Sequence, residues 1–135
     1  MSGTYYKELI VWQKSLLLVK HIYLVTQKFP PHELYGLVNQ MRRAAVSIPS
    51  NIAEGQMRNS PAEFARFLAI ASGSLAELET QMIIAQEIGY MTQQQGAEFF
   101  SLHSEVSRML TALKNKIIQL KTNDGQLTTK NLPHQ

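Results

Sequence analysis

The sequence contains no cysteine, which excludes disulfide bonds, thiolate metal sites and cysteine nucleophiles. It also lacks long apolar runs: stretches such as SLLLV, from Ser15 to Val19, are far shorter than the roughly 20 residues of a membrane-spanning helix. The first residues, MSGTYYKE, do not show the basic region and apolar stretch of a signal peptide. We therefore expect a cytoplasmic protein that has no membrane partner.

Recognisable catalytic and metal-binding patterns are missing as well. The four histidines do not form the Glu-x-x-His pairs that di-iron bundles need. The sequence has no HExxH motif, no phosphate-binding P-loop and no GxGxxG fingerprint, and its serines do not occur in a nucleophile elbow. These absences predict a protein that is not an enzyme and that uses no metal and no cofactor.

What the sequence does contain is four segments of helical periodicity, at about residues 7–28, 33–57, 60–89 and 92–121. The Pro30-Pro31 pair ends the first segment, because proline cannot continue a helix. Ser60 followed by Pro61 is typical of a helix start, and so is Thr92 with a glutamine three residues later. Residues 123–135 are polar, and we expect them to form a disordered tail.

In each segment, apolar residues recur at alternating steps of three and four. A seven-residue apolar repeat keeps one side of a helix facing its neighbours and favours nearly parallel helix packing. With 135 residues, 44% hydrophobic content and short connections, the chain is long enough for one domain with a core. The sequence therefore predicts an all-α protein, an antiparallel up-down-up-down four-helix bundle spanning residues 1–122.

The first segment carries more apolar residues than one core-facing side of a helix can use. A row at Leu9, Leu16 and Tyr23 is accompanied by two further rows, and leaving large aliphatic side chains in water forfeits about 1.5–3 kcal/mol each. Scattered surface leucines are the simpler explanation, but seven-residue rows favour an interface between subunits. The predicted interface residues are Ile10, Leu17, Leu24, Val11, Leu18 and Val25.

The stretch RRAAVSIPSNIAEG, from Arg42 to Gly55, places a proline inside a well-patterned helix. Pro49 removes one backbone donor at a cost of about 3 kcal/mol, and neighbouring polar side chains are suited to bond the freed carbonyls. Gly73, inside the third segment, is expected where another backbone approaches closely. We expect a kink and an outward polar stripe around Pro49, and the close approach of the second helix or of another subunit at Gly73. The residues of this structural motif are Ser47, Pro49, Ser50, Asn51, Glu54, Gly55 and Gly73.

Charge is unevenly distributed although the net charge is only +3. Residues 1–60 carry seven Lys/Arg against three acids, residues 61–97 one against four, and residues 98–135 five against three. A solvated surface explains mild basicity, but this asymmetry is also compatible with an anionic partner.

The motifs RRAAVSIPSNIAEG and ASGSLAELE, with the opening LIVWQKSLLLVKHIYLVTQKFP, resemble the small four-helix-bundle family encoded in intervening sequences of bacterial large-subunit ribosomal RNA genes. This family includes the accessory proteins of diversity-generating retroelements. The resemblance covers roughly residues 8–120. It implies a homopentameric ring, which in the retroelement branch is basic and binds nucleic acid and a reverse transcriptase.

Two hypotheses follow. In the first, a homo-oligomer, with a pentamer favoured, binds the backbone of structured RNA or DNA. Its predicted phosphate contacts are Arg42, Arg43, Lys14, Lys20, Lys28, Arg58, Lys114, Lys116 and Lys121. In the second, the chain is a protein–protein scaffold or an accessory subunit, for example of a reverse transcriptase, and nucleic acid plays no direct role.

Overall fold

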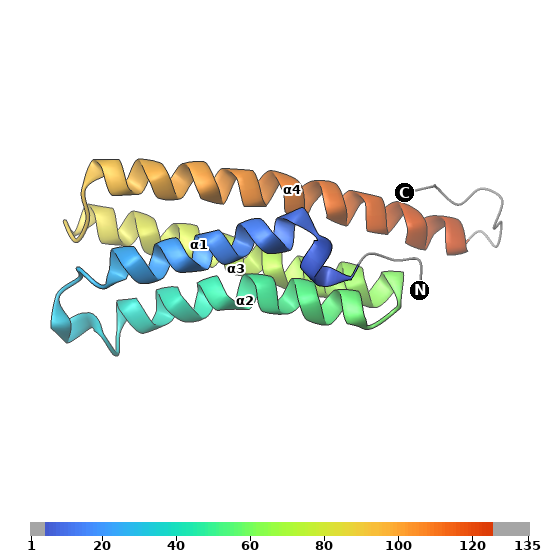
Figure 1. Cartoon of the computed structure of the whole chain (residues 1–135), viewed down its shortest axis with the longest axis horizontal. Coiled ribbons are helices and arrows are strands. Elements are labelled where there is room, and N and C mark those ends of the chain that lie inside the picture. Colours follow the sequence, from blue (N-terminus) through green and yellow to red (C-terminus); the bar gives the residue numbers. More distant parts are fainter. Residues whose placement is uncertain (1–4, 126–135) are drawn as a thin grey trace.

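The computed structural model describes the backbone of residues 5–125 and the side chains of residues 5–120. It contains four α-helices that run antiparallel in an up-down-up-down bundle (Figure 1). This confirms the predicted fold class, and the described residues contain no strand. The helices are α1 (Ile10–Thr26), α2 (Leu37–Met57), α3 (Pro61–Glu87) and α4 (Gln93–Gly125). Short 3-10 helices, η1 (Tyr6–Glu8) and η2 (Pro31–Glu33), precede α1 and α2.

Two helix starts follow the local signals in the sequence. The Ser60 hydroxyl accepts a hydrogen bond from the backbone N–H of Glu63 at 3.3 Å, at the start of α3. At the start of α4, Thr92 and Gln95 each accept a hydrogen bond from the other's backbone N–H, at 3.1 and 3.0 Å. Such reciprocal bonds satisfy donors that the first turn of a helix leaves free.

The ends of the helices differ from the sequence prediction in three places. Helix α2 begins at Leu37, four residues after its predicted start at about residue 33, and η2 precedes it. Leu9 is extended, so α1 begins only after η1, at Ile10. At the other end of the chain, α4 continues to Gly125, three residues into the predicted tail, and its last turns run past the other helices (Figure 1). Residues 126–135 lie outside the described part.

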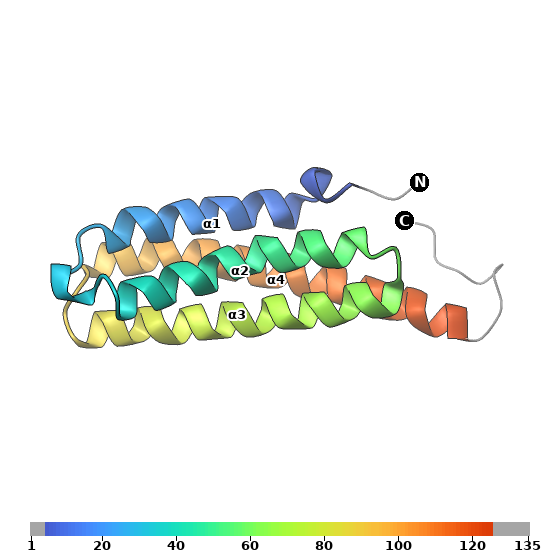
Figure 2. The same cartoon turned by 90° about the horizontal axis from the view of Figure 1, so that it is seen from below.

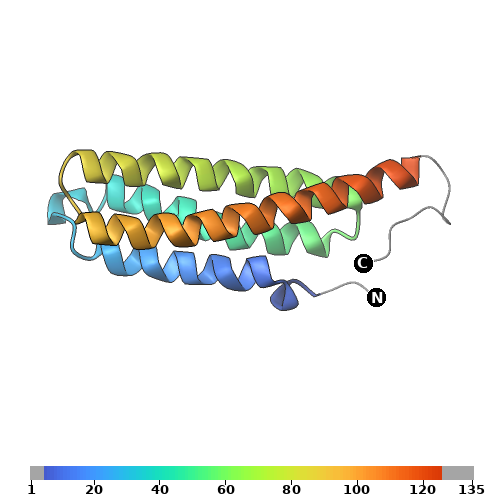
Figure 3. The same ribbon diagram turned by 90° about the horizontal axis from the view of Figure 1, so that it is seen from above.

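The core lies between the four helices, each of which contacts its two neighbours around the bundle (Figures 2 and 3). The predicted apolar positions of α2 and α3 fill it, with Met41, Ile48, Leu68 and Met82 fully buried. His103 of α4 is also buried, and its Nε2 atom lies 2.8 Å from the carbonyl oxygen of Leu75 on α3. This histidine is therefore part of the helix packing.

The structure corrects the prediction for α1. Val11, Leu18 and Val25 are buried in the core of the single protomer, so this row does not form a subunit interface. Leu16 and Tyr23, from the first row, are about two-fifths exposed, at 41% and 40%. The sequence contained three apolar rows, and helix periodicity alone could not decide which one faces the core.

The third row is exposed. Ile10, Leu17 and Leu24 are 60%, 51% and 54% exposed, the largest exposures among the apolar residues of α1. Lys14, on the same side of α1, forms an ion pair with Glu105 of α4 at 3.2 Å. Since residues three positions apart lie on neighbouring parts of a helix surface, Leu17 belongs to the side of α1 that borders α4. We call these three residues the α1 ridge; its role as an interface stays a prediction.

The proline motif differs from the prediction at Ser47. Helix α2 continues through the buried Pro49 to Met57. Ser47 is half-buried, and its hydroxyl lies 2.8 Å from that of Ser74 on α3, so it is not part of an outward stripe with Ser50 and Glu54. The side-chain amide of Asn51 donates to the carbonyl of Ser47 at 2.7 Å.

The two glycines also differ from expectation. Gly55 is the position of close helix contact: an added Cβ would lie 2.6 Å from the Cβ of Phe67 on α3. Around Gly73, in contrast, nothing in the described part of the protomer lies within 4 Å of an added Cβ, so the expected close approach of another helix is not found there. The approach of another subunit to Gly73 stays a prediction.

Helix α3 is long and apolar enough to cross a membrane, judged by length and composition alone. The prediction from uninterrupted apolar runs did not identify this helix. About two-fifths of its most apolar window, 44%, is buried inside the bundle. A core helix of a bundle can have the same length and apolar composition. The exposed apolar residues of α3 lie on its outer face.

Candidate nucleic-acid interface

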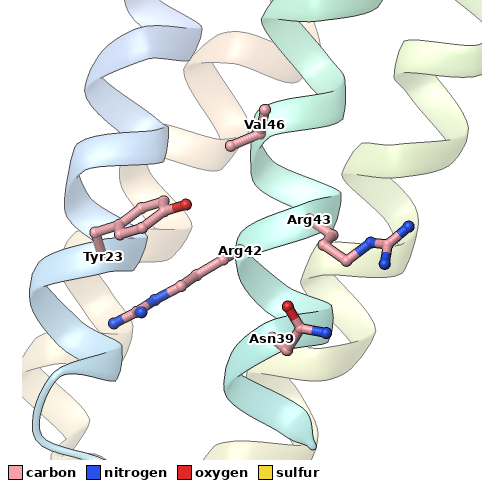
Figure 4. Close-up of a pocket in the computed structure, with 5 residues that line it drawn as sticks. All are labelled: Tyr23, Asn39, Arg42, Arg43 and Val46. Carbon is pink, nitrogen blue, oxygen red and sulfur yellow. The ribbon is translucent and has the colours of Figure 1, made fainter. Parts of the chain in front are cut away.

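An open groove of about 480 Å³ lies between α1 and α2 (Figure 4). Its lining residues are Tyr23 from α1 and Asn39, Arg42, Arg43 and Val46 from α2. Asn39, Arg42 and Val46 lie on one side of α2 because they follow each other at steps of three and four. The lining of the groove thus includes two arginines and an exposed aromatic ring.

Arg42 is held in place. Its side chain reaches across to α1, where its Nε donates to the Thr26 hydroxyl at 3.0 Å and its guanidinium lies 4.6 Å from the centre of the Tyr23 ring (Figure 4). A guanidinium over an aromatic ring is attracted by the electron density of the ring face. Fixed in this way, a guanidinium loses less conformational entropy when it binds an anion.

Arg43 is exposed and points to the other side of α2, towards α3 (Figure 4). It also lines a second open groove, of about 360 Å³, between α2 and α3. The walls of this second groove include Ser47, Ser74 and Glu77. Because its side chain is exposed, Arg43 can approach a phosphate bound at the α2 surface.

The surface around the first groove is poor in acids. Residues 9–53 carry five Lys/Arg against a single acid, Glu33, and α1 contains no acid. The Glu33 carboxylate accepts hydrogen bonds from the Tyr90 hydroxyl at 2.7 Å and from the backbone N–H of Leu37 at 3.2 Å. These bonds, above all that from Tyr90, lower the pKa of Glu33, and the same bond raises the pKa of Tyr90.

The structure brings only part of the predicted cations together. Arg42 and Arg43 both line the groove, Lys20 is exposed on α1, and Lys28 is exposed in the turn after α1. Lys14 is paired with Glu105, as stated above. Arg58 is paired with Glu54 at 3.0 Å, and its guanidinium lies over Phe67. Paired cations are weaker candidates, because phosphate must compete with the carboxylate.

The remaining predicted cations belong to α4. Lys114 is half-buried and Lys116 is exposed on this helix, away from the groove. The side chain of Lys121 lies outside the described residues. Of the nine predicted phosphate contacts, the geometry favours Arg42, Arg43, Lys20 and Lys28, which lie on α1 and α2 or directly after α1.

Sequence reasoning missed the partners of Arg42. In the sequence analysis Tyr23 belongs to an apolar row and Thr26 is not singled out, and the contact joins two helices across a loop, so no local spacing indicates it. The role of Gly55 against Phe67 was missed for the same reason. The signal that the sequence offered for the contact of Arg42 is a tyrosine in an apolar row of the helical segment that precedes the Arg-Arg pair.

Among the residues that the structure describes, no three His, Asp or Glu side chains are close enough together to hold a metal ion. Some buried and half-buried polar groups bond within the bundle, as the Ser47–Ser74 pair does, whereas His21 Nε2 and Gln81 Oε1 are buried without a hydrogen-bond partner among the described residues.

The family model described as 23S rRNA-intervening sequence protein matches residues 7–112. The chain belongs to this family. The match includes α1, α2 and α3 completely and most of α4, and therefore both grooves. In this chain, the stretch from Arg42 to Gly55 supplies the arginines of the groove and the close contact with α3. A search of curated proteins found no match.

Proposed function

We propose that this protein is a non-enzymatic homo-oligomer that binds the backbone of RNA or DNA through the groove between α1 and α2. The observation that carries the proposal is the pair Arg42 and Arg43 at an open groove between α1 and α2, in a stretch, residues 9–53, whose one acid, Glu33, is already hydrogen-bonded. Phosphate contacts supply most of the affinity of sequence-independent binding, and arginine suits them because its fork can donate two hydrogen bonds.

Self-association supports this function by summing weak charges. Five chains of net charge +3, as in the favoured pentamer, would carry +15. The potential of such an assembly would raise the local concentration of polyanions and their association rate. The exposed α1 ridge supplies the apolar surface for assembly.

A fluorescence-anisotropy titration with a structured RNA tests the proposal, comparing wild type with Arg43→Glu. We expect at least about tenfold weaker binding for the variant at about 50 mM salt, because it loses charge-assisted hydrogen bonds and gains repulsion. Wild-type affinity should also fall steeply between about 50 and about 200 mM salt.

Arg108→Glu is the matched control. Arg108 is exposed on α4, and its replacement changes the net charge by the same amount at a different place. Equal losses of RNA affinity in both variants would show that net charge alone determines binding and that the groove has no specific role. No binding of wild type at low salt would refute the proposal.

A second candidate function is a scaffold or accessory subunit that binds a partner protein, for example a reverse transcriptase. The observation that favours it is the turn before α2, where Tyr35 is 91% exposed beside the 46% exposed Leu34. Tyrosine is enriched at protein interfaces. Loss of partner binding in Tyr35→Ala, with RNA binding unchanged, would support this alternative.

A further inference from the structure

The outer face of α3 carries an apolar surface that no residue in the described part of the protomer covers. Ile70, Ile83 and Ile84 are 41%, 45% and 45% exposed. Between them, at steps of three and four, lies a line of small exposed residues: Ala69, Gly73, Ala76 and Thr80. We call this line the α3 valley, because large side chains border it and an added Cβ at Gly73 meets only open space.

Gly73 is unfavourable where it stands. Glycine in an exposed helix interior is costly relative to alanine, and the protomer gains no contact in return. A helix laid along the valley would use the missing side chain for close approach. The α1 ridge, with three large aliphatic side chains seven residues apart, has the complementary shape.

Charge decides how two copies can use these surfaces. Helix α1 has no acid, and Lys20 and Lys28 are exposed beside the ridge. A symmetric dimer that packs ridge against ridge would bring these lysines close to their copies, and like charges in an interface oppose association. On α3, Glu77 and Glu87 are exposed near the valley, so a ridge placed in the valley pairs opposite charges.

We propose that the α1 ridge of one copy docks into the α3 valley of a second copy, in a head-to-tail interface. This inference rests on the self-association in the proposed function and names the surface that receives the ridge. Two copies joined in this way still have one free ridge and one free valley between them. Head-to-tail contacts therefore close into a ring or continue as a filament, and they do not end at a dimer. The groove with Arg42 and Arg43 lies on the opposite side of α1 from the ridge and stays open.

The absence of natural cysteines makes cross-linking a direct test. We would replace Leu17, the centre of the ridge, and Ala76, in the valley, to obtain L17C, A76C and the double variant. A short bismaleimide would then be added, which tolerates a small offset between the helices. Helices α1 and α3 make no direct contact within the described protomer, so a link between the two positions reports on two molecules.

We expect the double variant to form covalent trimers and larger species on a denaturing gel. Each single variant should remain a single chain, because a head-to-tail interface never brings two copies of the same residue together. The control L17C/A97C places the second cysteine on the exposed side of α4, at Ala97, and should give no ladder.

Efficient dimer formation by L17C alone would overturn the inference in favour of a symmetric interface. So would an unlinked double variant whose mass in light scattering still shows assembly. A wild-type protein that is monomeric would refute both this inference and the self-association it rests on. An intact ladder without RNA binding would refute only the proposed nucleic-acid function.

Discussion

At the scale of single residues, two glycines with similar sequence surroundings have opposite structural roles. Gly55 lies where α2 and α3 touch, with Phe67 and Phe64 directly opposite. Gly73 faces open space within the protomer. The contacts of each site, and not helix propensity alone, therefore determine what a methyl group would do there.

We predict that Gly55→Ala destabilises the protein by about 1–3 kcal/mol, because the added methyl forces α2 and α3 apart. Gly73→Ala is the control and should raise the free energy of unfolding by up to about 1 kcal/mol. Both would be measured by urea unfolding in a protein that also carries Leu17→Glu, so that self-association does not contribute. Equal effects of the two substitutions would contradict the packing seen at Gly55.

The bond between Glu33 and Tyr90 predicts a dependence of stability on pH. Because this bond lowers the pKa of Glu33 from its usual 4.5, its contribution is present above pH 4.5 and is lost as the pH falls through the lower folded pKa. Tyr90→Phe should therefore reduce the loss of stability between about pH 6 and about pH 3.

Tyr35→Phe is the matched control for this measurement, since Tyr35 is 91% exposed. Urea unfolding of the three proteins at both pH values would show the effect. A Tyr90→Phe protein as acid-sensitive as wild type would show that the bond does not stabilise the ionised carboxylate.

At the scale of helices, the apolar repeat predicted which elements form, and the capping signals at Ser60 and Thr92 predicted where two of them begin. It failed for the orientation of α1, because rows through Leu16, Leu17 and Leu18 are equally regular in sequence. Only packing against α2 and α4 places Leu18 inside. The candidate site was predictable as an Arg-Arg pair, whereas its contact with Tyr23 depends on how two helices meet.

Neighbouring leucines in α1 should therefore respond differently to substitution. Leu18 is fully buried, and Leu18→Ala should cost about 2–5 kcal/mol in urea unfolding. Leu17→Glu should keep the helical circular-dichroism signal but lower the molar mass in solution. A large loss of helix in Leu17→Glu, or none of stability in Leu18→Ala, would contradict the orientation of α1.

At the scale of the whole molecule, the two long sides of the bundle differ in charge. The side of α1 and α2 is basic, while residues 61–97, which include α3, carry four acids against one arginine. Such a molecule can pair its own opposite sides and still expose the arginine groove to a polyanion. The proposed self-association and the proposed nucleic-acid binding would thus use different surfaces of the same protomer.

The molar mass in solution tests this account most directly, since assembly through the α1 ridge underlies both the head-to-tail interface and the summed positive charge. Multi-angle light scattering of wild type should give a multiple of the 15.3 kDa chain mass, five chains being the favoured number, and Leu17→Glu should reduce it. A wild-type mass of 15.3 kDa, with the ridge left in water, would contradict the account.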